Sequence, residues 1–389
     1  MKLHLPMALL KVQFLLAAAI VMAQVLGKET LVSILFAGTF PVTVGLWLTA
    51  EKGFSEADKL AVSLLLLSCL SVAGNTLASG AGLSLSYLKK QLIFWTTVLF
   101  FSGAARISPE ENDVDFFLRG NGLLALFLLG IYLLRGEQMY VWQGKRSQYL
   151  TFGFTNPNLA AVFLASVCIL EWIAWGWSRR RLEKAGHGCL GLVMGWFVWK
   201  TQARNAQLLL LFFLAAGLLP ELLGSRGKRL PDWACLLVGI FPLLFALCYL
   251  GVVQSPWVQR WFGFWISEGK ALDSRTQIWL FAWKQFCGSP LLGNYSRLSG
   301  NFGVLQMHNS HLDVLVSYGT PVLLVLWMFL TQLLKGGKPR GQLCQRGFVA
   351  LLLSGMGEAM LFSGGLGIYI FAGILRMLAN YDGNRGERT

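Results

Sequence analysis

The chain has 389 residues, of which 55% are hydrophobic and only 13% are charged, and its formal net charge is +14. A soluble domain carries about 25% charged residues, so this sequence lacks the polar surface of a protein that lives in water. The Lys and Arg residues are spread over many short segments and form no basic block with interleaved aromatic residues, so no nucleic-acid partner is expected. The composition predicts a polytopic membrane protein whose main surroundings are the lipid bilayer.

Apolar runs long enough to cross a bilayer, or somewhat shorter, recur from one end of the chain to the other. There are about twelve of them: Met7–Val25, Leu31–Ala50, Leu60–Leu77, Leu92–Ala105, Phe117–Leu134, Leu159–Trp177, Gly188–Lys200, Ala206–Leu223, Trp233–Val253, Val314–Leu334, Phe348–Phe362 and Gly364–Ala379. We expect an all-α membrane fold with nine helices in residues 1–253, a large extracytoplasmic loop carrying short helices in residues 254–312, and three helices with a cytoplasmic tail in residues 313–389.

The distribution of basic residues predicts how the chain is oriented. Lys and Arg concentrate in alternate connections, such as residues 179–184, 226–229 and 335–346, and such connections face the cytoplasm. This places the long polar segment, Pro256–Leu312, on the outer face. Two other polar segments, residues 153–158 and the hairpin 201–205, are predicted on the same face. Three polar clusters on one side of a membrane protein indicate a site.

Arg204 is the first candidate for chemistry. It lies at the tip of the hairpin Thr201–Asn205, whose first helix is short, so the side chain is expected near the level of the headgroups. An ionisable group at that depth is costly and marks a potential site. The alternative is an Arg that extends to the interface and binds lipid phosphate.

Arg275 is the second candidate. Asp273 or Ser274 is a plausible N-cap for a helix that continues at helical spacing, which places Arg275 in the first turn. The helix dipole disfavours a cation there, so the position is explained if a phosphate binds beside the free backbone N–H groups. An ion pair between Arg275 and Asp273 or Glu268 is an equally open interpretation.

His308 and His311, two of the four histidines in the chain, precede an apolar helix together with Asp313. A histidine can accept a proton from a hydroxyl group at neutral pH, and Asp313 is placed to orient one of the two rings. The alternative is a helix-start cap with interfacial histidines. The H-x-x-H spacing has no third or fourth ligand nearby, so no metal site is expected.

Two further sets of residues remain open from the sequence. Trp257, Trp261 and Trp265 recur every four residues, which is typical of an interfacial aromatic belt and could also provide stacking surfaces for sugar rings. Glu171 and Glu358 lie inside predicted spans, as candidates for internal pairing or as partners of a basic residue.

Five polar segments then follow one another along the chain: Gly153-Phe-Thr-Asn156-Pro157-Asn158, Thr201-Gln-Ala203-Arg204, Asp273-Ser274-Arg275-Thr276, Pro290-Leu-Leu-Gly293 and His308-Asn309-Ser-His311-Leu-Asp313. In residue types and order, this set resembles the motifs of the O-antigen ligase and O-antigen polymerase superfamily. The chain departs from the family at Ala203, where a Ser is usual, and at Asn294-Tyr295, where the family commonly continues G-x-G. The resemblance covers Gly153 to Gly319, and the flanking helices fit only by hydropathy.

The resemblance implies a metal-independent, inverting glycosyltransferase of the GT-C-like kind in the bacterial cytoplasmic (inner) membrane, acting without a cofactor on the extracytoplasmic face. It implies a glycan on undecaprenyl diphosphate as donor, and an acceptor glycan or lipid-linked saccharide. Arg204 and Arg275 would bind the donor diphosphate, and His308 would be the general base. Asn156, Asn158, Ser274, Asn309, His311 and Asp313 are the expected supporting residues.

The sequence also leaves alternatives to this enzyme. Within the superfamily, the sequence does not separate a polymerase of O-antigen, capsule or exopolysaccharide repeats from a ligase. A lipid-linked glycan flippase or transporter is a different class, and it predicts charged or broken helices at the membrane midplane. A scaffold without chemistry is the third class, and it predicts that Arg275 and His308 tolerate substitution.

Overall fold

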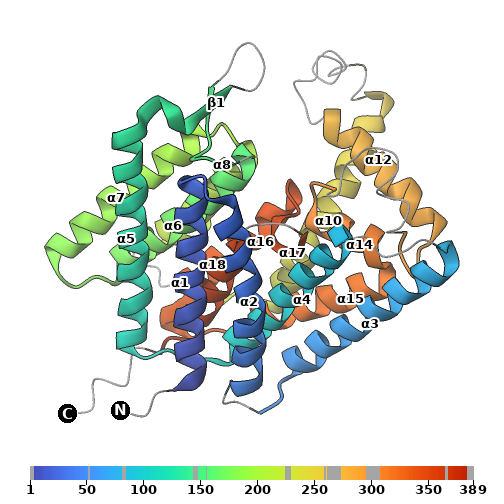
Figure 1. Cartoon of the computed structure of the whole chain (residues 1–389), viewed down its shortest axis with the longest axis horizontal. Coiled ribbons are helices and arrows are strands. Elements are labelled where there is room, and N and C mark those ends of the chain that lie inside the picture. Colours follow the sequence, from blue (N-terminus) through green and yellow to red (C-terminus); the bar gives the residue numbers. More distant parts are fainter. Residues whose placement is uncertain are drawn as a thin grey trace.

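The computed structural model of the chain (Figure 1) describes residues 4–50, 53–80, 85–142, 148–154, 156–223, 229–257, 260, 273–294, 307–363 and 367–382. Within these ranges the fold is helical apart from one short antiparallel hairpin, in which β1 (Tyr140–Trp142) pairs with β2 (Gln148–Leu150). The sequence did not suggest this hairpin. The predicted class, an all-α membrane protein, agrees with the rest.

The helices of the first half are α1 (Leu5–Val25), α2 (Glu29–Thr49), α3 (Glu56–Ser79), α4 (Leu85–Arg106), α5 (Glu111–Arg135), α6 (Pro157–Trp177), α7 (Arg181–Lys200) and α8 (Arg204–Phe213). A π-helical turn, Leu214–Leu218, joins α8 to α9 (Leu219–Leu222). The second half contains α10 (Asp232–Gln254), α12 (Asp273–Gly288), α14 (Ser310–Tyr318), α15 (Thr320–Lys335), α16 (Gln342–Leu353), α17 (Met360–Ser363) and α18 (Ile368–Leu378). Short 3-10 turns occur at Gly136–Met139, Pro339–Gly341 and Ser354–Met356.

Seven helical segments in the described part of the chain are long and apolar enough to cross a bilayer. They are α1, α2, α3, α5, α6, the continuous segment from α8 to α9, and α10. The number rises to eight if α15 and the following helix, which are bent by 114° relative to each other, form one broken span. A polytopic membrane protein is therefore confirmed by length and composition, and the count of about twelve spans stays a prediction.

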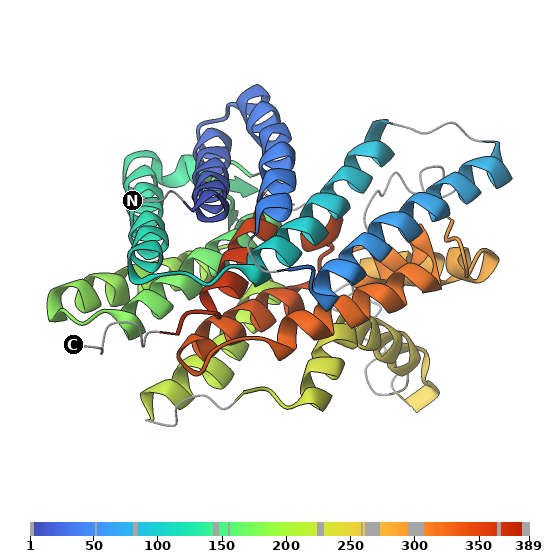
Figure 2. The ribbon, with the colours of Figure 1, turned by 90° about the horizontal axis from the view of Figure 1, so that it is seen from below.

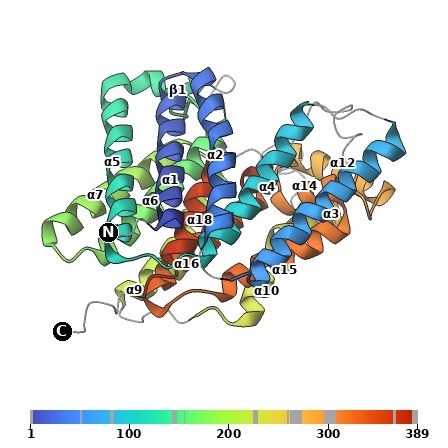
Figure 3. The ribbon, with the colours of Figure 1, turned by 60° about the horizontal axis from the view of Figure 1, so that its bottom comes forward.

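The helices form two groups. On one side α1, α2 and α5 stand roughly parallel, and on the other α3 and α15 lie side by side (Figures 1 and 2). Helix α6 belongs to the first group, where it packs against α5, α7, α8, α16 and α18, and nearly all of its length is buried. A third view shows α4 running between these two groups, in line with its packing against α2 and α18 and against α3 and α15 (Figure 3).

Local sequence signals set the start of α6. Asn156 is the N-cap, and its side-chain oxygen accepts a hydrogen bond from the backbone N–H of Asn158 at 2.8 Å. Pro157 follows at the first helical position, where its missing N–H costs nothing. An Asn cap stabilises a helix by about 1 kcal/mol. This cap therefore fixes where the first residues of α6 stand.

The expected span Val314–Leu334 is broken at Gly319. Helix α14 ends there and α15 begins at Thr320, and Gly319 has φ 85° and ψ 178°. The segment Pro290–Gly293 packs into the break, because the backbone N–H of Thr320 donates to the carbonyl of Pro290 at 2.9 Å. Two motif segments thus meet backbone to backbone at this glycine, a contact that hydropathy cannot reveal.

Replacing Gly319 with Ala is expected to destabilise the protein by about 1–3 kcal/mol, because the residue occupies a backbone region reserved for glycine. An added Cβ would also lie 2.2 Å from the carbonyl oxygen of Leu291. Thermal unfolding in detergent measures the effect. The matched control is Gly251→Ala in α10, where a Cβ meets nothing within 4 Å and helix propensity favours Ala. Equal melting temperatures for the two variants would contradict the prediction.

The expected span Phe348–Phe362 is also interrupted. Helix α16 ends at Leu353, the 3-10 turn Ser354–Met356 follows, and α17 starts only at Met360. Glu358 lies between the two helices, with 1% of its side chain exposed. The carboxylate is therefore at a helix break inside the protein and not on a continuous transmembrane helix.

Candidate functional site

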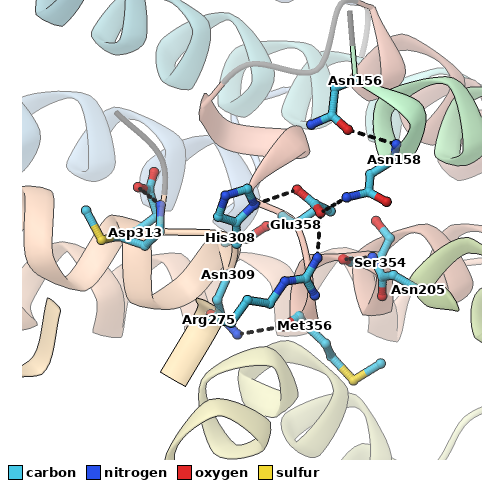
Figure 4. Close-up of polar contacts among 12 residues, drawn as sticks. Asn156, Asn158, Asn205, Arg275, His308, Asn309, Asp313, Ser354, Met356 and Glu358 are labelled. Atoms are coloured by element: carbon cyan, nitrogen blue, oxygen red, sulfur yellow. Dashed lines mark hydrogen bonds and ion pairs between the residues drawn. The ribbon is translucent and has the colours of Figure 1, made fainter. Parts of the chain in front are cut away.

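The buried carboxylate of Glu358 is the centre of the candidate site (Figure 4). The guanidinium Nη2 of Arg275 lies 2.7 Å from Oε1 of Glu358, and the amide Nδ2 of Asn158 donates to the same oxygen at 2.6 Å. The Nδ1 atom of His308 lies 3.0 Å from the other oxygen, Oε2. Three residues from three of the five motif segments thus converge on one carboxylate.

The burial of Glu358 explains why it needs these partners. A carboxylate taken out of water without hydrogen bonds or an opposite charge is very costly. Here both oxygens are engaged, one by a charge-assisted bond from Arg275, the strongest type of protein hydrogen bond. The side chains of Arg275 and His308 are 18% and 29% exposed. The acid is therefore buried, whereas its basic partners reach the surface.

The helix break at Ser354–Met356 is held by Asn205, which directly follows the second motif segment, and by Ser310 of the fifth segment. The amide Nδ2 of Asn205 donates to the carbonyl of Ser354 at 2.7 Å, and the hydroxyl of Ser310 donates to the carbonyl of Glu358 at 3.1 Å. Gly357 leaves room for the site, since a Cβ there would lie 2.8 Å from Nη1 of Arg275. The hairpin that carries Asn205 and the start of α14 therefore fix the backbone four residues before Glu358 and at Glu358 itself.

The start of α14 is anchored on α10 at an internal proline. Pro242 cannot donate a backbone hydrogen bond, which weakens the helix locally. The amide of Asn309 donates to the carbonyl of Pro242 at 2.6 Å, and Nε2 of His311 contacts the carbonyl of Gly239 at 2.7 Å. Asn309 also caps α14 by accepting from the N–H of Leu312 at 3.0 Å. Asn309 and His311 are therefore buried residues that anchor the start of α14 on α10, and their supporting roles in a reaction stay a prediction.

Asp313 was expected to orient a histidine, and the structure corrects this. Its carboxylate forms a buried ion pair with Nζ of Lys90 in α4 at 2.8 Å. One of its oxygens also accepts from the backbone N–H of Met307 at 3.2 Å, and the indole of Trp279 donates to the carbonyl of Met307 at 2.8 Å. Both sides of the Met307 backbone are thus held, so Asp313 acts on the residue that precedes His308.

Backbone strain gathers at the motif segments. Among the described residues, the non-glycine positions with positive φ are Phe152 at 49°, Gln202 at 56° and His308 at 50°. They stand beside or inside the first, second and fifth segments. A left-handed conformation costs a non-glycine residue about 1–3 kcal/mol and persists only where surrounding contacts impose it. The contacts of Met307 and Asn309 supply that constraint at His308.

The other expected site residues lie near this centre. Arg204 is exposed at the first position of α8, next to Asn205. Asn156 caps α6. Ser274 lies in the first turn of α12, which begins at Asp273, so the predicted placement of Arg275 in that turn is confirmed. Among the described side chains, the ion-pair partner of Arg275 is Glu358. Glu268 and the side chain of Asp273, the partners considered from the sequence, lie outside the described part of the chain.

Several residues raised by the sequence fall elsewhere. Trp257 is 65% exposed, and Trp261 and Trp265 lie outside the described residues, so the aromatic stripe stays a prediction. Glu171 is an internally paired acid at the other end of α6, with Nδ1 of His187 at 2.7 Å. Glu358 was noted as a partner for some basic residue but not as a site residue. The signal that could have placed it was Gly355 and Gly357 beside it, which mark a helix break.

No protein-family model matches this chain, and no curated protein matches its sequence.

The arrangement limits the chemistry that the site can perform. With Nδ1 of His308 bonded to a carboxylate, the other ring nitrogen, Nε2, is left to exchange a proton with a ligand. Arg275 uses one end of its guanidinium for Glu358, and a guanidinium has five N–H donors, so donors remain for an anion. A base oriented by an acid, next to an anion-binding cation, suits transfer of a group from an anionic leaving group to a hydroxyl.

Proposed function

We propose that this protein is a membrane glycosyltransferase that moves a glycan from an undecaprenyl-diphosphate donor to a sugar hydroxyl at the outer surface of the bacterial cytoplasmic membrane. The proposal rests on one observation: the side chains of Asn158, Arg275 and His308 all contact the buried carboxylate of Glu358. These three residues come from segments that resemble the O-antigen ligase and polymerase superfamily, and Asn158 lies 200 positions before Glu358 in the sequence.

Arg275 binds the donor diphosphate in this proposal, and Arg204 joins it from the start of α8. The bond from the anomeric carbon to the diphosphate oxygen breaks in the reaction, and the electron pair leaves with the undecaprenyl diphosphate. Fixed guanidinium groups stabilise that developing charge. Arg275 lies in the first turn of α12, where free backbone N–H groups and the helix dipole favour the same anion.

His308 is the general base of the proposed reaction. Its Nε2 takes the proton of the acceptor hydroxyl while the hydroxyl oxygen forms the new bond to the anomeric carbon. Attack from the side opposite the leaving diphosphate inverts the configuration at that carbon. Glu358 accepts the Nδ1–H and so keeps the lone pair on Nε2, the role that a carboxylate plays behind a catalytic histidine. No second carboxylate is required, unlike in hydrolytic glycosidases.

A lipid-glycan transporter is the second candidate, and specific observations favour it. The helix breaks at Gly319 and at Ser354–Met356, together with the buried ion pair of Lys90 and Asp313, are features of transporter folds. A transporter needs no base, and an ion pair of Arg275 with Glu358 would serve it as a gate. The two candidates differ in what accumulates when the site is damaged.

The deciding experiment complements cells that lack the protein with wild type, Arg275→Ala or Arg275→Lys. Loss of one charge-stabilising donor is expected to lower transfer by about 10²–10³-fold, and Lys is not expected to restore it, because it lacks the planar fork of donors. Arg181→Ala is the matched control, since Arg181 is exposed at the start of α7, at the opposite end of α6.

The readout is the size of the surface glycan and of the polyprenyl-linked pool, by gel and mass spectrometry. Single repeat units that accumulate on the outward-facing lipid indicate a polymerase, and full-length chains that remain on it indicate a ligase. A lipid-linked pool trapped in the inner leaflet identifies a transporter and removes the transferase proposal. Wild-type glycan with a properly inserted Arg275→Ala protein removes both.

A further inference from the structure

A second polar cluster lies at the end of α6 remote from the candidate site. It lines a cavity of about 530 Å³ formed by the first turns of α5, the end of α6, the start of α7, Arg340 in the turn after α15, and Tyr381 after α18. Its charged and aromatic lining residues are Glu111, Asp115, Arg119, Trp177, Arg179, Arg180, Glu183, His187, Arg340 and Tyr381. A cavity of this size holds a small ligand.

The length of α6 fixes the depth of this cavity relative to the candidate site. Asn158 contacts Glu358 from the first turn of α6, whereas Trp177 is its last residue and lines the cavity. Helix α6 has 21 residues, and at about 1.5 Å per residue it is about as long as the hydrocarbon core is thick. The cavity therefore lies near the opposite membrane surface, at the level of the lipid headgroups.

The cavity presents both signs of charge. Four arginines and three carboxylates line it. Arg119 pairs with Asp115 at 3.4 Å, and Arg179 and Arg180 pair with Glu111 and Glu183, each at 3.7 Å. All of these side chains are more than 40% exposed, and exposed pairs contribute only about 0–1 kcal/mol each. A ligand that carries an anion and a cation can replace these contacts at little cost.

His187, which lines the cavity, contacts the buried carboxylate of Glu171. Nδ1 of His187 lies 2.7 Å from the carboxylate of Glu171, which is fully buried and also accepts from the amide of Asn121 at 2.6 Å. This fixes the ring of His187, which is 17% exposed and lines the cavity. Since Nδ1 is occupied, Nε2 is the nitrogen left for a ligand. An ionisable pair at the end of a transmembrane bundle indicates a site by default.

An aromatic pair adds a surface suited to a cation. The rings of Trp177 and Tyr381 lie in contact with their centroids 5.4 Å apart, and both line the cavity. Aromatic faces attract ammonium groups, and carboxylates accept hydrogen bonds from them. The arginines, in turn, recognise phosphate by paired N–H donors.

We propose that this cavity binds a phosphate ester that also carries a primary ammonium group, as in a phosphoethanolamine unit. The phosphate contacts Arg179, Arg180 and His187, and the ammonium group contacts Glu111 and Glu183 beside Trp177. The ligand is either the headgroup of an aminophospholipid or a soluble phosphoethanolamine compound. This site is separate from the proposed transfer site and does not depend on it.

Native mass spectrometry of the full-length protein in detergent tests the proposal with three lipids at equal concentration: phosphatidylethanolamine, phosphatidylcholine and phosphatidylglycerol. Phosphatidylethanolamine is expected to bind best, because phosphatidylcholine has no N–H donors and phosphatidylglycerol has no cation. The variant Arg179→Gln/Arg180→Gln is expected to lose at least tenfold in this binding, whereas Arg181→Gln, whose side chain does not line the cavity, is expected to match wild type.

A second variant and a soluble ligand complete the test. Glu111→Gln/Glu183→Gln is expected to keep phospholipid binding but to lose the preference for phosphatidylethanolamine over phosphatidylglycerol. Soluble O-phosphoethanolamine that displaces the lipid would identify a soluble ligand, and failure to displace it would identify the lipid headgroup. Equal binding of all three lipids, unchanged in both double variants, would overturn the proposal.

Discussion

Replacing His308 with Ala is expected to lower glycan transfer by about 10²–10⁴-fold, the contribution of a positioned general base. The reason is the geometry at Glu358, whose Oε2 lies 3.0 Å from Nδ1 of His308, so that Nε2 alone can receive the acceptor proton. Donor binding is expected to change little, because Arg275 keeps its own contact with Glu358. The rate of transfer in proteoliposomes supplied with polyprenyl-diphosphate glycan measures the effect.

The control for this variant is His4→Ala, an exposed histidine before α1. It should transfer glycan at the wild-type rate. The amount of inserted protein and its melting temperature must also match between the two variants, since His308 has a φ of 50° and Ala adopts a left-handed conformation less readily than His. If His308→Ala transfers at more than about a tenth of the wild-type rate, His308 is not the base, because that loss is below the range of general base catalysis.

The helical framework could be predicted well from the sequence, because burial in a bilayer demands long apolar runs. The predicted bounds were least accurate where a helix continues through charged residues. The run Leu92–Ala105 is part of α4, which starts at Leu85 and includes the buried Lys90. Hydropathy counts such a lysine as the end of a span. Backbone hydrogen bonds continue through it when a partner such as Asp313 is available.

The candidate site could be predicted only in part, because its pairing depends on contacts distant in sequence. The motifs indicated that Arg275 and His308 act together, but 83 residues separate Arg275 from Glu358 and 223 separate Lys90 from Asp313. Asp313 was linked to the histidines by closeness along the chain. On a helix, residues two apart point in different directions, so His311 was already a poor partner for it.

Hydropathy alone could not place Glu358 at a helix break in the candidate site. A single acid in an apolar run reads as an exception within a span, whereas Gly355 and Gly357 just before it mark the helix break that turns it toward α6, α12 and α14. At this break, Glu358 contacts residues of three motif segments. The side chains of Asn158, Arg275 and His308 are held together because each of them contacts an oxygen of the Glu358 carboxylate. The acid and its three donors therefore have to be considered as one unit.

Replacing Glu358 with Gln is expected to lower transfer by about 10²–10⁴-fold, approaching the loss that follows when a catalytic histidine is left in the wrong tautomer. A Gln amide can donate to Nδ1 of His308, which places the proton on Nε2 and blocks proton uptake. Arg275 also loses its anionic partner. Stability is expected to fall by only about 1–3 kcal/mol, because the side chains of Arg275 and His308 are 18% and 29% exposed and reach water.

The double variant His308→Ala/Glu358→Gln tests whether Glu358 affects transfer by positioning His308 or in another way. If Glu358 acts through His308, the double variant transfers glycan no more slowly than His308→Ala alone, because residues that act as a unit are not additive. Glu56→Gln is the matched control, since Glu56 is an exposed acid paired with Lys59 at 2.6 Å. Losses that multiply in the double variant would mean that Glu358 contributes independently of His308. Glu358 would then act through Arg275, because the position of the guanidinium that binds the donor depends on the same carboxylate.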